Sequence, residues 1–172
     1  MYFEEGNPRR FVVPDVFVAK GCPRGDRRTF KLWDEAGVPN FVIEVTSPST
    51  KHVDLKSKPD TYSAIGVGEF VMFDPLNEYL NPALRMLRLN GNRYEAVEPD
   101  SSGRLYSEEL NLFLFLNGTE LVMQDAQTGR PLPTDAEAEA RIAADEARVT
   151  AEQRITQLEA ELRRLRESQR SS

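Results

Sequence analysis

Apolar residues in the first half of the chain fall into short runs separated by turn-forming residues. The runs at 11–19 and 40–47 are rich in β-branched residues and are bounded by Pro, Gly or Asn, which is typical of strands. A third apolar run covers residues 69–74. It is closed by Asp74 before a proline, a position that favours a strand end over a metal ligand. This part of the chain therefore predicts three strands.

The intervening and following segments predict one helix and two hairpins. Residues 53–65 predict a helix that ends at Gly66, since glycine commonly follows the last helical residue. Further along, two pairs of apolar segments each flank an Asn-Gly turn, which is a strong signal for an antiparallel β-hairpin. The predicted hairpins join 84–89 with 94–97, and 112–116 with 120–123.

A long charged segment follows a linker at 129–133 that contains Gly and Pro. From Asp135 to about Glu167 the chain lacks both of these residues and is rich in Ala, Glu and Arg, which predicts a helix roughly 45 Å long at 1.5 Å per residue. Thr134 and Glu137 have the spacing of a capping box at its start.

Apolar positions on this helix predict self-association. An isolated helix gains most of its stability by packing an apolar face against a partner, so we expect a coiled-coil-like helix that forms a homodimer. Four residues keep a/d heptad spacing: Ile155, Leu158, Leu162 and Leu165. The earlier Ile142 and Val149 are one position out of that register. We expect two domains, residues 1–134 and residues 135–172.

The composition is that of a globular domain with a charged extension. The 172 residues, of which 40% are hydrophobic and 29% charged, can hold one domain with a core plus an appendage. No run approaches the roughly 18 apolar residues of a membrane span, and no cationic segment precedes an apolar one at the N-terminus. We therefore expect a cytoplasmic protein without a membrane span.

Few residues could bind a soft metal. Cys22 is the only cysteine, which excludes an intramolecular disulfide and a zinc ribbon, and His52 is the only histidine. A bound metal would therefore be a hard ion held by carboxylates, such as magnesium or manganese. The net charge of −6 argues against strong non-specific binding to nucleic acid. It does not exclude a nuclease, because a metal adds positive charge at the site.

Two carboxylates stand in apolar strand sequence. Glu44 lies in a run whose two faces are both largely apolar, as in a strand covered on both sides. A carboxylate buried there cannot be solvated and needs a metal, a cation or strong hydrogen-bond donors. The alternative is an edge strand with Glu44 in water. Asp15 follows Pro14 and alone would be read as a turn residue, so its significance depends on pairing with Glu44.

Several short motifs carry a family resemblance. They are Pro14-Asp15, the run from Glu44 to Thr50, the spacing of Asp54, Lys58 and Tyr62, and the run from Gly66 to Pro75. On these motifs, over roughly residues 1–134, the chain resembles the bacterial putative restriction endonuclease family of the PD-(D/E)XK nuclease superfamily. The resemblance implies an α/β fold with a mixed sheet and a metal site at the edge of that sheet. It also implies Asp15 and Glu44 as metal ligands and a lysine near the scissile phosphate.

The identity of that lysine is open. In the superfamily motif the lysine stands two residues after the acid, on the same strand face, and that position here is Thr46. The family pattern points instead to Lys58 on the following helix, where Tyr62 would share its face. Pro59 disfavours a helical conformation for Lys58, which leaves Lys56, or no catalytic lysine at all, as alternatives.

Two functions follow from these residues. The first is a metal-dependent endonuclease that hydrolyses phosphodiester bonds in DNA, with Asp15, Glu44 and Lys58 as catalytic residues and Mg (or Mn) as cofactor. The alternative is a catalytically degenerate nuclease fold that serves as a scaffold or interaction protein through its C-terminal helix. Family members usually carry a helix before the strand that contains Pro14 and Asp15, and an aromatic residue at the position of Val71. This chain begins at Met1 almost directly before that strand, and it has valine in place of the aromatic residue. Both departures favour a truncated or degenerate member.

Overall fold

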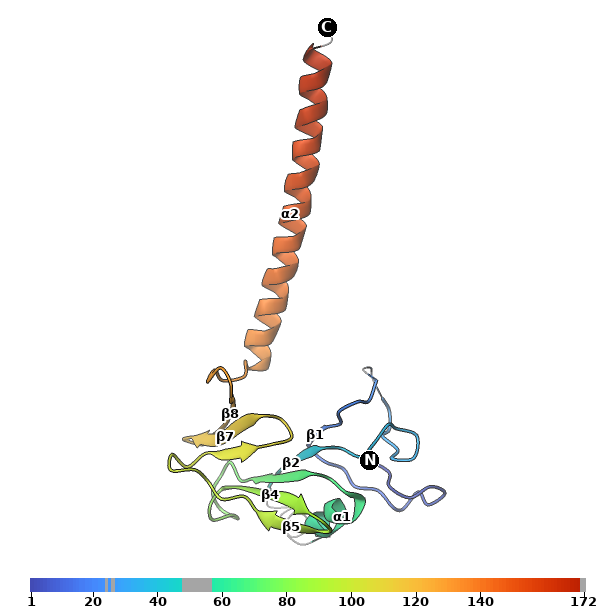
Figure 1. Cartoon of the computed structure of the whole chain (residues 1–172), viewed down its shortest axis with the longest axis vertical. Helices are drawn as coiled ribbons and strands as arrows, with labels where there is room; N and C mark the ends of the chain where they lie inside the picture. Colours follow the sequence, from blue (N-terminus) through green and yellow to red (C-terminus); the bar gives the residue numbers. More distant parts are fainter. Residues whose placement is uncertain (24, 26, 48–56, 171–172) are drawn as a thin grey trace. The chain divides into compact units, whose positions relative to one another are not determined.

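The computed structural model describes residues 1–23, 25, 27–47 and 57–170, with the backbone alone at 161, 162 and 164–170. The chain divides into two compact units, Met1–Pro131 and Leu132–Ser172. Among the described residues, the first unit holds two β-sheets and one helix, and the second holds one long helix (Figure 1). This mixed α/β fold with a C-terminal helix is the predicted fold class.

The larger sheet has five strands in the order β1-β2-β3-β4-β5. Their bounds are Val16–Val18 (β1), Phe41–Val45 (β2), Glu69–Phe73 (β3), Leu84–Asn90 (β4) and Arg93–Ala96 (β5). β2 and β3 are parallel, whereas the other neighbours are antiparallel. Because parallel neighbours need a crossover connection, helix α1 (Lys58–Ile65) lies between them in the chain. The sheet is therefore mixed, as the resemblance implied.

The smaller sheet is antiparallel, in the order β6-β7-β8. Its strands are Leu105–Ser107 (β6), Leu112–Asn117 (β7) and Glu120–Asp125 (β8). Both predicted hairpins are present, β4–β5 and β7–β8, and their turns use the positive φ of Gly91 (62°) and Gly118 (64°). The sequence did not predict β6, because a strand of three residues is too short for alternation to show.

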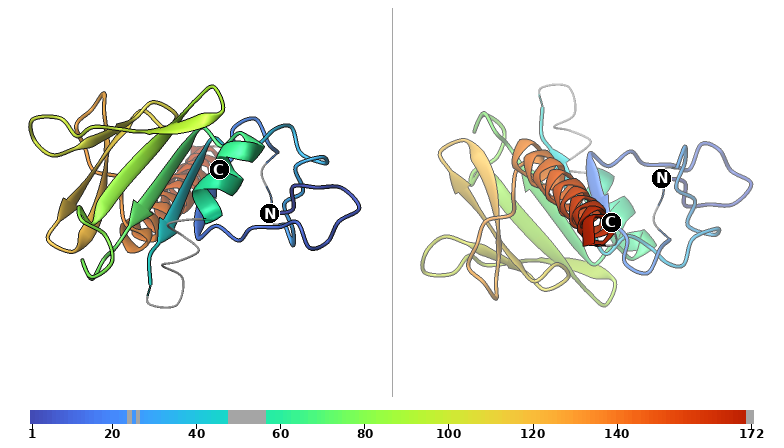
Figure 2. Two further views of the ribbon diagram at one scale, coloured as in Figure 1. Left: turned by 90° about the horizontal axis from the view of Figure 1, so that it is seen from below. Right: turned by 90° about the horizontal axis from the view of Figure 1, so that it is seen from above.

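The two faces of the larger sheet pack into separate hydrophobic cores. On one face Ile43 and Val71 pack with Leu114 of the smaller sheet. On the other face Val42 packs with Tyr62 of α1. Figure 2 shows the smaller sheet and α1 on opposite sides of the larger sheet. The central strands are therefore covered on both sides, which is why the first four residues of β2 are buried.

The first strand is shorter than predicted. Instead of residues 11–19, β1 covers Val16–Val18, and Phe11 forms only an isolated bridge outside it. Pro14 accounts for the difference, because proline has no N–H to donate to a neighbouring strand. Asp15 consequently stands at the entry to β1.

Helix α1 is described from Lys58, and the predicted helical residues 53–56 lie outside the described residues. Pro59 lies in the first turn, where a missing N–H has no intrahelical partner to lose. Gly66 ends the helix as predicted, with a φ of 88° and its N–H bonded to carbonyls of the last turn. Pro59 therefore fixes the start of the helix beside Lys58 instead of kinking its interior.

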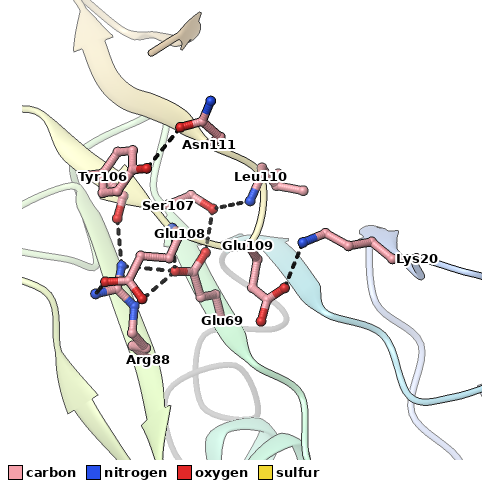
Figure 3. A network of polar contacts seen from close by, with 9 residues as sticks. All are labelled: Lys20, Glu69, Arg88, Tyr106, Ser107, Glu108, Glu109, Leu110 and Asn111. Carbon is pink, nitrogen blue, oxygen red and sulfur yellow. Dashed lines mark hydrogen bonds and ion pairs between the residues drawn. The ribbon is translucent and has the colours of Figure 1, made fainter. Parts of the chain in front are cut away.

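A polar network joins β3 of the larger sheet to β6 and the turn that follows it (Figure 3). Glu69 is buried and accepts hydrogen bonds from Arg88, from the hydroxyl of Ser107 and from the N–H of Glu108. The Ser107 hydroxyl oxygen in turn accepts the N–H of Leu110 at 3.1 Å. Because a buried carboxylate needs a counter-charge and donors, this network explains Glu69 without any ligand.

The second unit contains helix α2, Asp135–Arg170. The predicted capping box is present: Thr134 N–H donates to Glu137 Oε2 at 2.9 Å, and Glu137 N–H donates to Thr134 Oγ1 at 3.4 Å. Within the described part of the chain, no helix is long and apolar enough to cross a membrane. Several apolar side chains of α2 are exposed, namely Ile142, Val149, Ile155 and Leu158.

Candidate functional site

Glu44 lies near the end of β2 with its side chain turned toward α1. The residue is 0% exposed. The ammonium of Lys58 donates to Oε2 at 2.7 Å, and the hydroxyl of Tyr62 donates to Oε1. Glu44 therefore occupies a covered strand, as predicted, and the alternative of an edge strand in water is excluded.

One face of α1 supplies both partners of Glu44. Lys58 and Tyr62 are four residues apart, which places them on the same side of a helix. Tyr62 is fully buried and packs on Phe70, with ring centroids 5.1 Å apart. The side chain of Lys58 is 13% exposed. The buried tyrosine thus anchors the helix, and the lysine reaches Glu44 from the edge of the core.

The surroundings of Glu44 act on its pKa in both directions. Burial has the largest effect and raises the pKa, because a low-dielectric environment disfavours the charged carboxylate. Hydrogen bonds from Lys58 and Tyr62 lower the pKa, and the negative charge of Asp15 raises it. The net shift of the pKa is upward. The ionised carboxylate is therefore held at an electrostatic cost that additional positive charge would reduce.

Asp15 is held beside Glu44 by the strand backbone. β1 and β2 are antiparallel, with Val16 opposite Ile43. Asp15 Oδ2 accepts the N–H of Val45 at 2.7 Å. Asp15 itself is exposed, and its charge acts on Glu44. The two carboxylates thus come from neighbouring strands, one facing solvent and the other buried.

A cleft of about 680 Å³ opens beside these residues. Asp15 and Lys58 both line it, so an acidic and a basic residue border one space. Its other lining residues are the hydroxyl-bearing Ser47, Ser57 and Thr61 and the apolar Phe11, Val12, Val13 and Val45. A concave site with a few convergent polar groups is typical of ligand binding.

The donor set fits a hard divalent cation. Asp15 and Glu44 supply carboxylate oxygens, and Lys58 offsets only one of their two negative charges. Thr46 Oγ1, two residues beyond Glu44, is buried and has no hydrogen-bond partner among the described residues. Within those same residues, no three or more His, Cys, Asp or Glu side chains cluster. Magnesium sites often use only one or two carboxylates, with water and phosphate oxygens completing the coordination.

The structure brings Asp15, Glu44 and Lys58 together, and their roles remain predictions. Lys58 approaches Glu44 from the helix, where the family pattern placed it. Lys56, the alternative lysine, lies outside the described residues. The hydrogen bond from Tyr62 to Glu44 was not predicted, and the only signal for it in the sequence was the four-residue spacing from Lys58.

Asp74 has a different role, as the sequence indicated. It is 1% exposed and accepts the backbone N–H groups of Leu76, Tyr79 and Leu80 at 3.2, 2.6 and 2.9 Å. Burial alone would raise its pKa, but these donors outweigh burial and lower it. Asp74 therefore closes the turn after β3 and is not part of the site.

The first 123 residues match the model of a known protein family. The family is described as "Uma2: Putative restriction endonuclease". The matched range includes β1, β2 and α1, which carry Asp15, Glu44 and Lys58. No curated protein matches the chain.

Proposed function

The chain belongs to the Uma2 family of putative restriction endonucleases, and we propose that it is a metal-dependent endonuclease that hydrolyses phosphodiester bonds in DNA. The proposal rests on one observation, that an acidic residue, a buried carboxylate and a lysine lie close together. Asp15 and Lys58 line the same cleft, and Lys58 also contacts the buried Glu44. Family membership supports a nuclease-like function, and the metal, the DNA substrate and the residue roles are the proposed parts.

Asp15 and Glu44 would hold a magnesium or manganese ion at the wall of the cleft. Such an ion, when bound, lowers the pKa of a coordinated water and polarises a phosphate oxygen. The Val45 N–H keeps Asp15 in place, and the Tyr62 hydroxyl keeps Glu44 in place. Both carboxylates are therefore oriented by contacts that exist before any ion arrives, which reduces the reorganisation that binding requires.

Lys58 would act on the phosphate. Lys58 lines the cleft, so its ammonium could contact non-bridging phosphate oxygens as negative charge develops on them. The side chain is only 13% exposed, and a charge screened little by solvent acts more strongly on its neighbours. Removing one preorganised donor of this kind typically reduces turnover about 10²–10³-fold.

A second candidate function is a catalytically degenerate scaffold. Lys58 and Tyr62 already engage both carboxylate oxygens of Glu44, as they would in a site that no longer binds metal. The protein would then act through a homodimer, in which α2 packs against a second copy. Of the predicted seam, Ile155 and Leu158 are exposed and available for that contact, whereas Leu162 and Leu165 lie outside the described side chains.

Cleavage of supercoiled plasmid DNA by the purified protein distinguishes the two functions. We expect nicked and linear products in Mg²⁺ or Mn²⁺, none in EDTA, and none with Glu44→Gln. The matched control is Glu109→Gln, because Glu109 also pairs with a lysine, Lys20, at 2.9 Å but does not line the cleft. Circular dichroism would show that each variant is folded. Metal-independent cleavage, or equal cleavage by Glu44→Gln, would contradict the endonuclease proposal.

A further inference from the structure

The oxygens of Glu44 have two partners of different kinds. Oε2 is bound by a cation, the ammonium of Lys58, at 2.7 Å. Oε1 is bound by a neutral donor, the hydroxyl of Tyr62. A metal ion that used Oε2 would have to share it with another positive charge in a buried place, where two cations repel strongly. The Tyr62 hydroxyl on Oε1 carries no charge, so a metal on Glu44 would not repel it and Tyr62 need not leave.

We propose that Lys58 is a placeholder for the metal on Glu44 Oε2, and that Tyr62 is the positioning residue that holds Oε1 throughout. In the metal-free protein Lys58 supplies the counter-charge that the buried carboxylate needs. When a divalent cation takes Oε2, Lys58 gives up that oxygen and moves within the cleft that it already lines. This inference rests on the proposed metal site of Asp15 and Glu44.

The position of Lys58 makes such an exchange physically reasonable. Its side chain is 13% exposed, in contrast to 0% for Glu44, so it can leave Glu44 without crossing the core. Asp15 lines the same cleft and offers a second carboxylate for the metal. The exchange would release the ammonium from Glu44 only when the metal is bound. Lys58 would thus be available to a phosphate at the moment when the metal is present.

Tyr62 is suited to remain in place. It is fully buried, it packs on Phe70, and its backbone carbonyl accepts the N–H of Gly66 at the end of α1. Its hydroxyl holds Oε1 of Glu44 and so restricts rotation of the carboxylate while the partner of Oε2 changes from Lys58 to the metal. A residue that only stabilised the fold would affect stability without affecting metal affinity.

The proposal predicts opposite effects of two substitutions on Mn²⁺ affinity, measured without DNA from the EPR signal of free Mn²⁺. Lys58→Met removes the competitor and should tighten binding about tenfold. Tyr62→Phe removes the positioning donor and should weaken binding about threefold or more. Each has a matched control. Lys20→Met removes a lysine paired with Glu109, and Tyr94→Phe removes the hydroxyl of another tyrosine that packs near Phe70. Both controls should bind like the unmodified protein.

A second measurement covers the case in which Lys58→Met does not fold. In the unmodified protein labelled with ¹⁵N-lysine, the Nζ signal of Lys58, identified by its loss in Lys58→Arg, should shift and exchange faster with solvent as Mg²⁺ is added. Any of three results overturns the exchange. The Lys58 signal is unchanged at saturating Mg²⁺, the protein does not bind Mn²⁺, or folded Lys58→Met binds Mn²⁺ no more tightly than the unmodified protein. If the exchange is seen but plasmid DNA is not cleaved, the endonuclease proposal fails and this inference stands. If DNA is cleaved but Lys58→Met does not bind more tightly, this inference fails alone.

Discussion

Removing Lys58 should destabilise the metal-free protein because it leaves the Glu44 carboxylate buried without its counter-charge. Glu44 is 0% exposed and its ion pair with Lys58 is 2.7 Å long, so solvent cannot replace the lost ammonium. Breaking a buried ion pair by removing one partner typically costs about 3–5 kcal/mol. The lower end applies here, about 3 kcal/mol, since Tyr62 still donates to Oε1 and a carboxyl with a raised pKa can take up a proton.

The double variant Lys58→Met/Glu44→Gln tests whether the uncompensated charge is the cause. In the Glu44→Gln background, where position 44 is a neutral amide, Lys58→Met should cost only about 1 kcal/mol, which gives a coupling of about 2 kcal/mol between the two positions. Lys20→Met is the surface control, and loss of its exposed pair with Glu109 should cost less than about 1 kcal/mol.

Urea denaturation in EDTA, followed by far-UV circular dichroism, measures these free energies of unfolding. For a unit the size of Met1–Pro131, a loss of about 3 kcal/mol also lowers the thermal midpoint by roughly 10 °C. If Lys58→Met is as stable as the unmodified protein, or if Lys58→Met costs as much in the Glu44→Gln background as in the unmodified protein, the reasoning about a buried charge is wrong.

Three further predictions concern other parts of the chain. Asp74→Asn should destabilise the protein at pH 7. The folded pKa of Asp74 lies below the ordinary 3.8, so the stabilisation by its carboxylate is present above pH 3.8 and is lost as the pH falls through the folded pKa. Urea titrations of the unmodified protein and of Asp74→Asn should therefore converge in acid. Gly68→Ala should lower the thermal midpoint, since a Cβ there would lie 2.9 Å from the Asn40 carbonyl oxygen, and an unchanged midpoint would contradict the close packing. Deletion from Asp135 onward should leave a folded core that sediments as a smaller species than the intact chain, whereas an intact chain that is monomeric at tens of micromolar would contradict homodimerisation through α2.

The sequence predicted the framework of the site because its signals are local. Apolar residues on both faces of β2 favour a covered strand, and together with the family resemblance that pattern favoured a buried Glu44 over an edge strand in water. Gly66 marks the end of α1 by its backbone preference, whereas the predicted start at residue 53 lies outside the described residues. Pro14 shortens β1 through an equally local effect, its missing N–H, which the apolar pattern of residues 11–19 does not reveal.

The contacts of the site could not be predicted in the same way. Whether Lys58 turns toward Glu44 or toward solvent depends on how α1 packs on the sheet, which no spacing within the helix specifies. The bond between Tyr62 and Glu44 joins residues 18 positions apart through the tertiary fold. The role of Glu69 depends on β6, a strand of three residues without a sequence signal, and on Ser107 within it.

The central claim is that Asp15 and Glu44 hold one divalent cation beside Lys58. Substituting Fe²⁺ for Mg²⁺ and adding ascorbate and peroxide tests it most directly, because hydroxyl radicals formed at the bound iron cut the nearest backbone. Mass spectrometry of the fragments should show cuts around residues 15 and 44, suppressed by excess Mg²⁺ and absent from Glu44→Gln. Cuts elsewhere, or an unchanged pattern in Glu44→Gln, would contradict the claim.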